Sequence, residues 1–192
     1  MHAEARPCLR QRYRLTMAGM RDELISMLET TPNHPSIRNR IAELEAQQPA
    51  DLNTDAARLK GVWDLRWSSA SQPWLRQSPW LVNLQILDPE QGRGCNLLCL
   101  RGPMGPLGGI SVVADIAVVS CQRVEVCFRK GGWRGPEFPG LGRLKLQRAV
   151  DQSFPAWLDI TVLDSDIRIC RGNAGTTFAL LRRPLLEVSD YV

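Results

Sequence analysis

The segment from residue 156 to residue 182 constrains the fold most, because it reads as three short β-strands joined by two tight turns. Apolar and polar residues alternate along it with the period of two that a strand imposes. Asp164 and Ser165 suit the first reversal, and Gly172 and Gly175 flank the second, where glycine accepts a positive φ. A meander this short needs upstream strands to complete its sheet.

Further strand patterns fill the chain from Gly61 onward. Trp63, Leu65 and Trp67 alternate with polar residues, so we expect these three side chains to face one way. Turns rich in glycine and proline separate the later apolar segments, which bring the total to about eight strands. Those segments cover residues 80–87, 95–101, 110–119, 124–129 and 141–150.

About eight antiparallel strands in succession predict an up-and-down barrel, because closure leaves no strand edge unpaired. The interior of a barrel of this size holds either side chains or one small ligand. An open sandwich is the alternative.

The chain before the strands has helical periodicity instead. Residues 18–29 predict an amphipathic helix, and Ser36 is placed to cap a second helix that ends before Pro49. The basic residues 1–17 are expected to form a disordered extension. The sequence thus predicts a mainly β protein with N-terminal α-helices, divided into residues 1–17, 18–60 and 61–192.

Charge and cysteine content exclude several classes of protein. The net charge is +4, and the arginines of the first 17 residues supply most of it, which argues against a nucleic-acid-binding surface elsewhere. Six cysteines without a CxxC pair, accompanied by two histidines, do not predict a metal site, and they suit a reducing compartment. No apolar run approaches the roughly 20 residues of a membrane-spanning helix.

No catalytic constellation is recognisable either. The strand region contains no histidine, so a Ser–His or Cys–His nucleophile pair cannot form there. Residues 172–177 lack the lysine of a phosphate-binding loop. Asp159, Asp164 and Asp166 occupy strand and turn positions where aspartate serves the backbone. We therefore expect no enzyme activity, no catalytic residue, no cofactor and no metal.

Two stretches resemble the PAP/fibrillin family, the plastid lipid-associated proteins. The first contains Leu59, Gly61, Trp63 and Leu65, followed by Trp67 where the family usually has tyrosine. The second contains the matching positions Trp157, Leu158, Asp159, Leu163, Asp164, Asp166, Arg168, Arg171, Gly172, Gly175, Thr176 and Phe178. The resemblance implies that these motif residues are mainly structural.

The resemblance implies a lipocalin-like barrel and a non-catalytic carrier or structural role for apolar small molecules, namely prenylquinones, carotenoids or fatty acids. It also implies peripheral contact with photosynthetic membranes (thylakoids) or with lipid globules such as plastoglobules, while the charge distribution argues against a nucleic-acid partner. No long transit peptide is evident, which favours a cyanobacterial cytoplasm over a plant or algal plastid. The alternatives are a lipocalin-like bilin lyase and a coat or scaffold protein without a ligand.

Specific residues are expected to serve this role. Trp63, Trp67 and Phe178 are the candidates for lining a cavity. Arg168 and Arg171 are expected to pair with the nearby aspartates and to pin the hairpins. Lys130, Trp133 and Arg134 lie in a glycine-rich stretch that predicts a loop tip, where a tryptophan between cations suits the membrane interface.

Overall fold

The computed structural model describes residues 7–72, 75, 77–102, 105, 108–152 and 155–191, with side chains from residue 19 onward. It divides into two compact units, Met1–Pro49 and Ala50–Val192. The predicted division at residues 17 and 60 stays a prediction. Within the described chain, no helix combines the length and the apolar character that crossing a membrane demands.

The first unit contains helix α1 (Pro7–Thr30) and helix α2 (Ile37–Gln47). Helix α1 begins before the predicted Ala18, while residues 1–6 of the predicted extension lie outside the described residues. Ser36 occupies the N-cap of α2, but its side chain makes no capping hydrogen bond. Arg40 of α2 ties the two helices together, because it donates to Glu23 of α1 as well as to Glu43, each at 3.1 Å.

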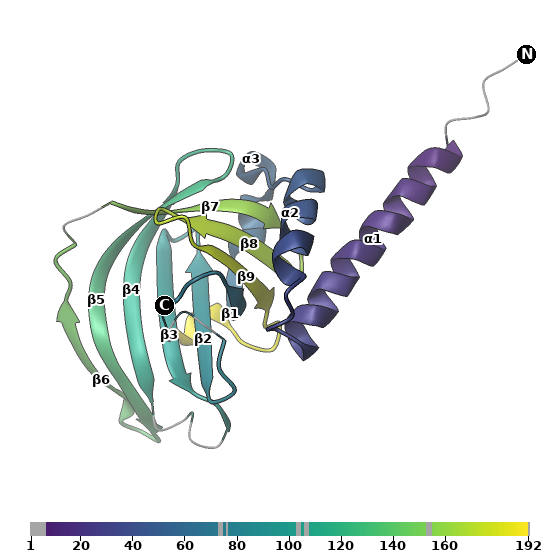
Figure 1. Ribbon diagram of the computed structural model, residues 1–192. Helices are drawn as coiled ribbons and strands as arrows, with labels where there is room; N and C mark the ends of the chain where they lie inside the picture. Colours follow the sequence, from purple (N-terminus) through teal and green to yellow (C-terminus); the bar gives the residue numbers. More distant parts are fainter. Residues whose placement is uncertain are drawn as a thin grey trace, which may run out of the picture. The chain divides into compact units, whose positions relative to one another are not determined.

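The second unit begins with two short helices and continues as strands (Figure 1). The helices are α3 (Leu52–Asp55) and the 3-10 helix η1 (Ala56–Leu59). Nine strands follow in the described residues: β1 (Gly61–Ser68), β2 (Leu81–Asp88), β3 (Arg93–Leu100), β4 (Gly109–Val118), β5 (Arg123–Phe138), β6 (Gly142–Ala149), β7 (Ala156–Leu163), β8 (Ile167–Gly172) and β9 (Thr177–Arg182). A 3-10 turn, η4 (Val188–Asp190), comes after β9.

The antiparallel strands close into a ring, which confirms the predicted barrel. Hydrogen bonds run in the order β4-β3-β2-β1-β9-β8-β7-β5, and β4 also pairs with β5. Strand β6 is outside this ring, because it pairs with β5 on the side away from β4. In Figure 1, β2 to β6 run from top to bottom, whereas β7 to β9 run across the view.

Strand β5 has two halves with different partners. Its first residues, from Arg123 to Val126, pair with β7 and close the ring. Its later residues, from Lys130 to Phe138, pair with β6 instead. Strand β4 pairs with both halves, with a register shift between Val113 and Ala114. On the side of β5 away from β4, its partner therefore changes from β7 to β6 between Val126 and Lys130.

The predicted loop tip at residues 131–136 is wrong, because this stretch is the second half of β5. Gly132 serves the close packing of β5 against β6. A Cβ on Gly132 would lie 2.1 Å from the backbone oxygen of Leu146 in β6, so only glycine permits this approach. Pro136 lies where the β5–β6 register shifts, a position at which a strand tolerates proline.

Buried side chains fill one end of the barrel completely. Leu52 of α3 and Leu59 of η1 pack there against Trp63, Leu163 and Leu180. Trp63 has no exposed surface, and its indole Nε1 donates to the Leu59 carbonyl at 3.0 Å. Among the described residues, this end is filled by buried side chains together with those of α3 and η1.

Candidate ligand-binding cavity

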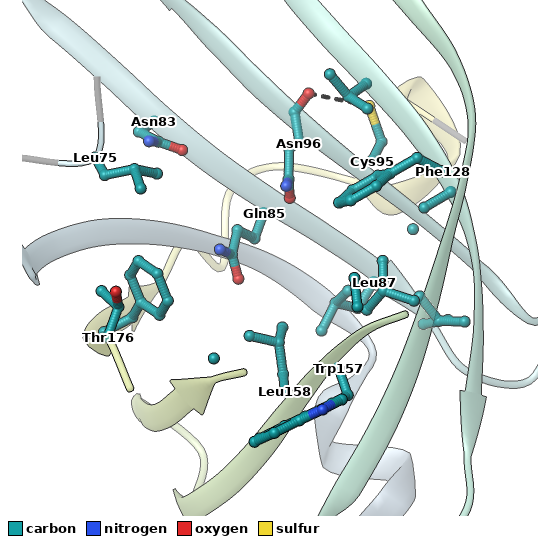
Figure 2. A pocket seen from close by; sticks show the side chains of 18 of the residues that line it. Leu75, Asn83, Gln85, Leu87, Cys95, Asn96, Phe128, Trp157, Leu158 and Thr176 are labelled. Atoms are coloured by element: carbon teal, nitrogen blue, oxygen red, sulfur yellow. Dashed lines mark hydrogen bonds between the residues drawn. The ribbon is translucent and has the colours of Figure 1, made fainter. Parts of the chain in front are cut away.

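The other end of the barrel encloses a cavity of about 620 Å³ (Figure 2). Its floor is continuous with the packed end, since Leu87, Ile116 and Phe178 belong both to the buried core and to the cavity lining. It opens to solvent at the start of β4, where the lining residue Ile110 is 58% exposed. The barrel interior is therefore part core and part open pocket.

Strand alternation builds the apolar wall of this cavity. On β4, Ile110, Val112, Ala114 and Ile116 occupy every second position and all line it. Their neighbours across β3 and β5 continue the same face. These further apolar lining residues include Leu98 of β3 and Val126 and Phe128 of β5, and Leu158 of β7 also lines the cavity.

The polar part of the lining consists of amide and hydroxyl groups. Gln85 lies near the middle of the close-up, between Asn96 and Leu158, and Thr176 lies at the left of the view (Figure 2). Asn83, Asn173 and Gln72 complete the polar set. None of the described residues that line the cavity carries a formal charge. A ligand here would meet apolar walls and a few neutral hydrogen-bonding groups.

Beyond the cavity, an exposed apolar row crosses three strands. Ile110 of β4 lies opposite Trp133 of β5, and Trp133 lies opposite Leu146 of β6. Their exposed fractions are 58%, 38% and 72%. Because direct cross-strand partners share a face, the row continues the cavity wall outward onto β6. The mouth of the cavity thus has an apolar lip.

The structure separates the three predicted cavity residues. Phe178 lines the cavity, whereas Trp63 is buried in the packed end and is not among the lining residues. Trp67 lies elsewhere because of a register shift between Leu65 and Trp67 against β9. The shift places Trp67 opposite Ala179, whose side faces away from the cavity, so the alternation that the sequence predicted is interrupted.

Most of the motif residues hold turns and strands in place. The Asp164 carboxylate accepts the backbone N–H groups of Asp166 and Ile167 at 2.8 and 2.9 Å. Gly175 has φ +74 in the last turn, and a Cβ on Gly61 would lie 2.3 Å from the Arg182 guanidinium. The other motif residues lie in strands β7 and β8. Gly172, Trp157 and Leu158 border the cavity, and Arg171 lies opposite Asp159.

The surroundings of Asp159 and Arg168 bear on the predicted ion pairs. Asp159 pairs with Arg123 of β5, whose Nε lies 2.7 Å from the carboxylate, and the same guanidinium covers the Trp157 ring at 4.1 Å. Arg168 has no exposed surface and donates through Nη2 to the amide oxygen of Gln85. The expectation that Arg168 pairs with an aspartate is therefore wrong for the described residues.

The predicted membrane residues lie on both faces of β5. Lys130 is exposed and lies opposite Val113, on the face away from the cavity. Trp133 belongs to the apolar lip. Arg134 is buried, donates to the Asp190 carbonyl and lies 4.7 Å from the Tyr191 ring. Of the three, Trp133 is thus the side chain placed to meet an apolar surface.

Sequence reasoning missed the polar groups of the cavity. Asn83, Gln85 and Asn96 occur in stretches that were correctly predicted as strands. In the sequence, these residues are marked only by amide side chains that alternate with apolar residues along each strand. Such alternation does not say which set faces inward, because an outward polar residue gives the same pattern.

A closed antiparallel barrel with one packed end and one apolar cavity is the lipocalin-like class of architecture. The chain belongs to the PAP_fibrillin family, whose sequence model matches residues 27–181. No curated protein and no solved structure matches the chain.

Proposed function

We propose that this protein is a non-catalytic carrier that holds one apolar small molecule in the barrel cavity. The observation that supports this most is the cavity itself: about 620 Å³, walled by aliphatic and aromatic side chains and containing only neutral polar groups. Binding pockets for small molecules commonly have volumes of about 300–1,000 Å³ and this mixture of groups. Prenylquinones, carotenoids and fatty acids are the ligand classes that membership of the lipid-associated family suggests.

Filling the cavity with a larger side chain should weaken the binding of an apolar ligand. Val112 lies on the inner face of β4, opposite Gly131, so a tryptophan there would project into the cavity. We expect Val112→Trp to weaken binding of a prenylquinone or of a neutral fluorescent probe by more than about tenfold, as steric exclusion removes the apolar contacts. Titration followed by fluorescence measures this loss.

Ala117→Trp provides the matched control, because Ala117 is an exposed residue on the same strand and faces away from the cavity. It should bind the probe as the unaltered protein does. If neither prenyl lipids nor the probe bind the unaltered protein, the ligand-free scaffold alternative replaces the carrier. Transfer of a bilin to an acceptor protein would instead favour the lyase alternative.

We further propose that the carrier exchanges its ligand at the surface of a membrane or lipid globule, as a peripheral protein of photosynthetic membranes. Its support is the apolar lip of Ile110, Trp133 and Leu146, which joins the cavity wall to the outside. Tryptophan is favoured at the depth of lipid head groups. A ligand could pass from lipid to cavity along this lip without crossing water.

Removing the lip should weaken the contact with lipid. We expect Trp133→Ser combined with Leu146→Ser to lower partitioning onto phosphatidylglycerol vesicles by at least about tenfold, since each side chain contributes apolar area. Vesicle sedimentation measures the bound fraction. Leu185→Ser is the control, because Leu185 is 95% exposed and lies outside the row. Equal loss in both proteins would contradict a specific role for the lip.

A further inference from the structure

Arg168 is a buried cation without a counter-charge. Its side chain projects from β8 into the barrel and has no exposed surface. Nη2 donates to the Gln85 amide oxygen, while Nε and Nη1 have no hydrogen-bond partner. Within the part of the chain that the structure describes, no carboxylate forms an ion pair with it. Such a group is unfavourable unless something further compensates it.

The surroundings of Arg168 increase this imbalance. Burial lowers the pKa of its guanidinium to about 10, so the group is still charged at neutral pH. The Trp63 ring lies 5.1 Å away and attracts the cation, but Arg182 covers the same indole at 4.2 Å. Two cations thus share one aromatic ring at the packed end of the barrel. Arg182 therefore adds a second positive charge near Arg168 and does not compensate it.

Gln85 connects this charge to the cavity. A guanidinium only donates hydrogen bonds, so Gln85 must present its amide oxygen to Arg168. The amide nitrogen is then left as a donor, and Gln85 is one of the residues that line the cavity (Figure 2). The cavity therefore has at its floor an N–H donor that is polarised by a cation directly behind it.

We propose that the cavity binds an amphiphile with a carboxylate head group, held at the floor by Gln85 with the Arg168 guanidinium behind it. The apolar chain of this ligand lies along the wall formed by β3, β4 and β5 and ends at the lip. The carboxylate supplies the missing negative charge: it accepts from the Gln85 amide, and the buried Arg168 guanidinium behind this amide attracts it through space. This inference rests on the proposed carrier function and narrows its ligand to long-chain acids.

The test compares an acid with its neutral ester. Oleate and methyl oleate share one chain and differ in charge, and each competes with a neutral fluorescent probe. We expect the unaltered protein to prefer oleate by at least about tenfold, which corresponds to one charge-assisted hydrogen bond. Arg168→Met should remove this preference and leave the affinity for methyl oleate within about threefold.

Two further variants keep the test decisive. Gln85→Leu should also reduce the preference, which covers the case that Arg168→Met does not fold. Lys130→Met removes an exposed cation on the face away from the cavity, and it should leave the preference unchanged. A purely structural role for Arg168 would change stability and the affinities for both ligands alike, but not their ratio.

The outcomes separate the two proposals. Equal affinity of the unaltered protein for oleate and methyl oleate would overturn the carboxylate site and leave the carrier function standing. A preference for oleate that persists in both Arg168→Met and Gln85→Leu would also overturn it. If neither ligand displaces the probe, or if the probe itself does not bind, the result contradicts the proposed carrier function itself.

Discussion

Replacing Trp63 by alanine is expected to lower the free energy of unfolding by about 3–5 kcal/mol. Trp63 has no exposed surface and packs in the solid end of the barrel with Leu59, Leu163 and Leu180. The substitution leaves a cavity the size of an indole and removes the hydrogen bond to the Leu59 carbonyl. It also removes the ring that two guanidinium groups contact, so both cations lose an attractive contact.

Urea denaturation followed by circular dichroism measures this loss. A cost of this size is a large share of the stability of an ordinary domain, so part of the variant protein should be unfolded without denaturant. Trp133→Ala is the matched control, since Trp133 is 38% exposed and should cost no more than about 1 kcal/mol. Similar values for the two variants would contradict the division into a packed end and an open end.

Arg182→Ala is expected to cost about 2–4 kcal/mol, from the loss of several hydrogen bonds to one charged group. The Arg182 guanidinium donates to three backbone carbonyls, those of Arg58, Lys60 and Ser165, at 2.5, 2.8 and 2.6 Å. It therefore links η1, the start of β1 and the β7–β8 turn. Without Arg182, these three carbonyls lose their charged hydrogen-bond donor at the packed end of the barrel.

Arg182→Lys should restore little of this stability, because an ammonium group lacks the planar fork that reaches three acceptors at once. Arg93→Ala is the control for the loss of a positive charge, as Arg93 is an exposed residue of β3. Denaturation at low and high salt separates the two contributions. A loss that disappears at high salt would indicate general electrostatics and not the three hydrogen bonds.

Most strands were predictable because alternation and turn residues are local signals. The meander from Ala156 to Arg182 was predicted closely, since its apolar positions and its turn glycines agree. The second half of β5 was not predictable. Its glycines look like turn residues, and Gly132 is explained only by the approach of Leu146 from a strand that comes later in the chain.

The candidate site was predicted less well, because its geometry depends on contacts between distant segments. Phe178 was expected in the cavity and lies there, but Trp67 was displaced by a register shift that leaves no mark on the local pattern. Arg168 was expected to pair with an aspartate close in sequence. Its partner is Gln85, which is 83 positions away, and only the closed barrel brings the two together.

The position of β6 outside the ring means that the size of the opening and the integrity of the barrel are set by different hydrogen bonds. Removing every β5–β6 pair would leave all eight closing pairs of the ring in place. Substitutions in the β5–β6 hairpin can therefore change the shape of the cavity entrance, or the lipid surface that the apolar lip contacts, without disturbing the cavity inside the ring. The entrance of the cavity can therefore vary in sequence independently of the closed ring of strands.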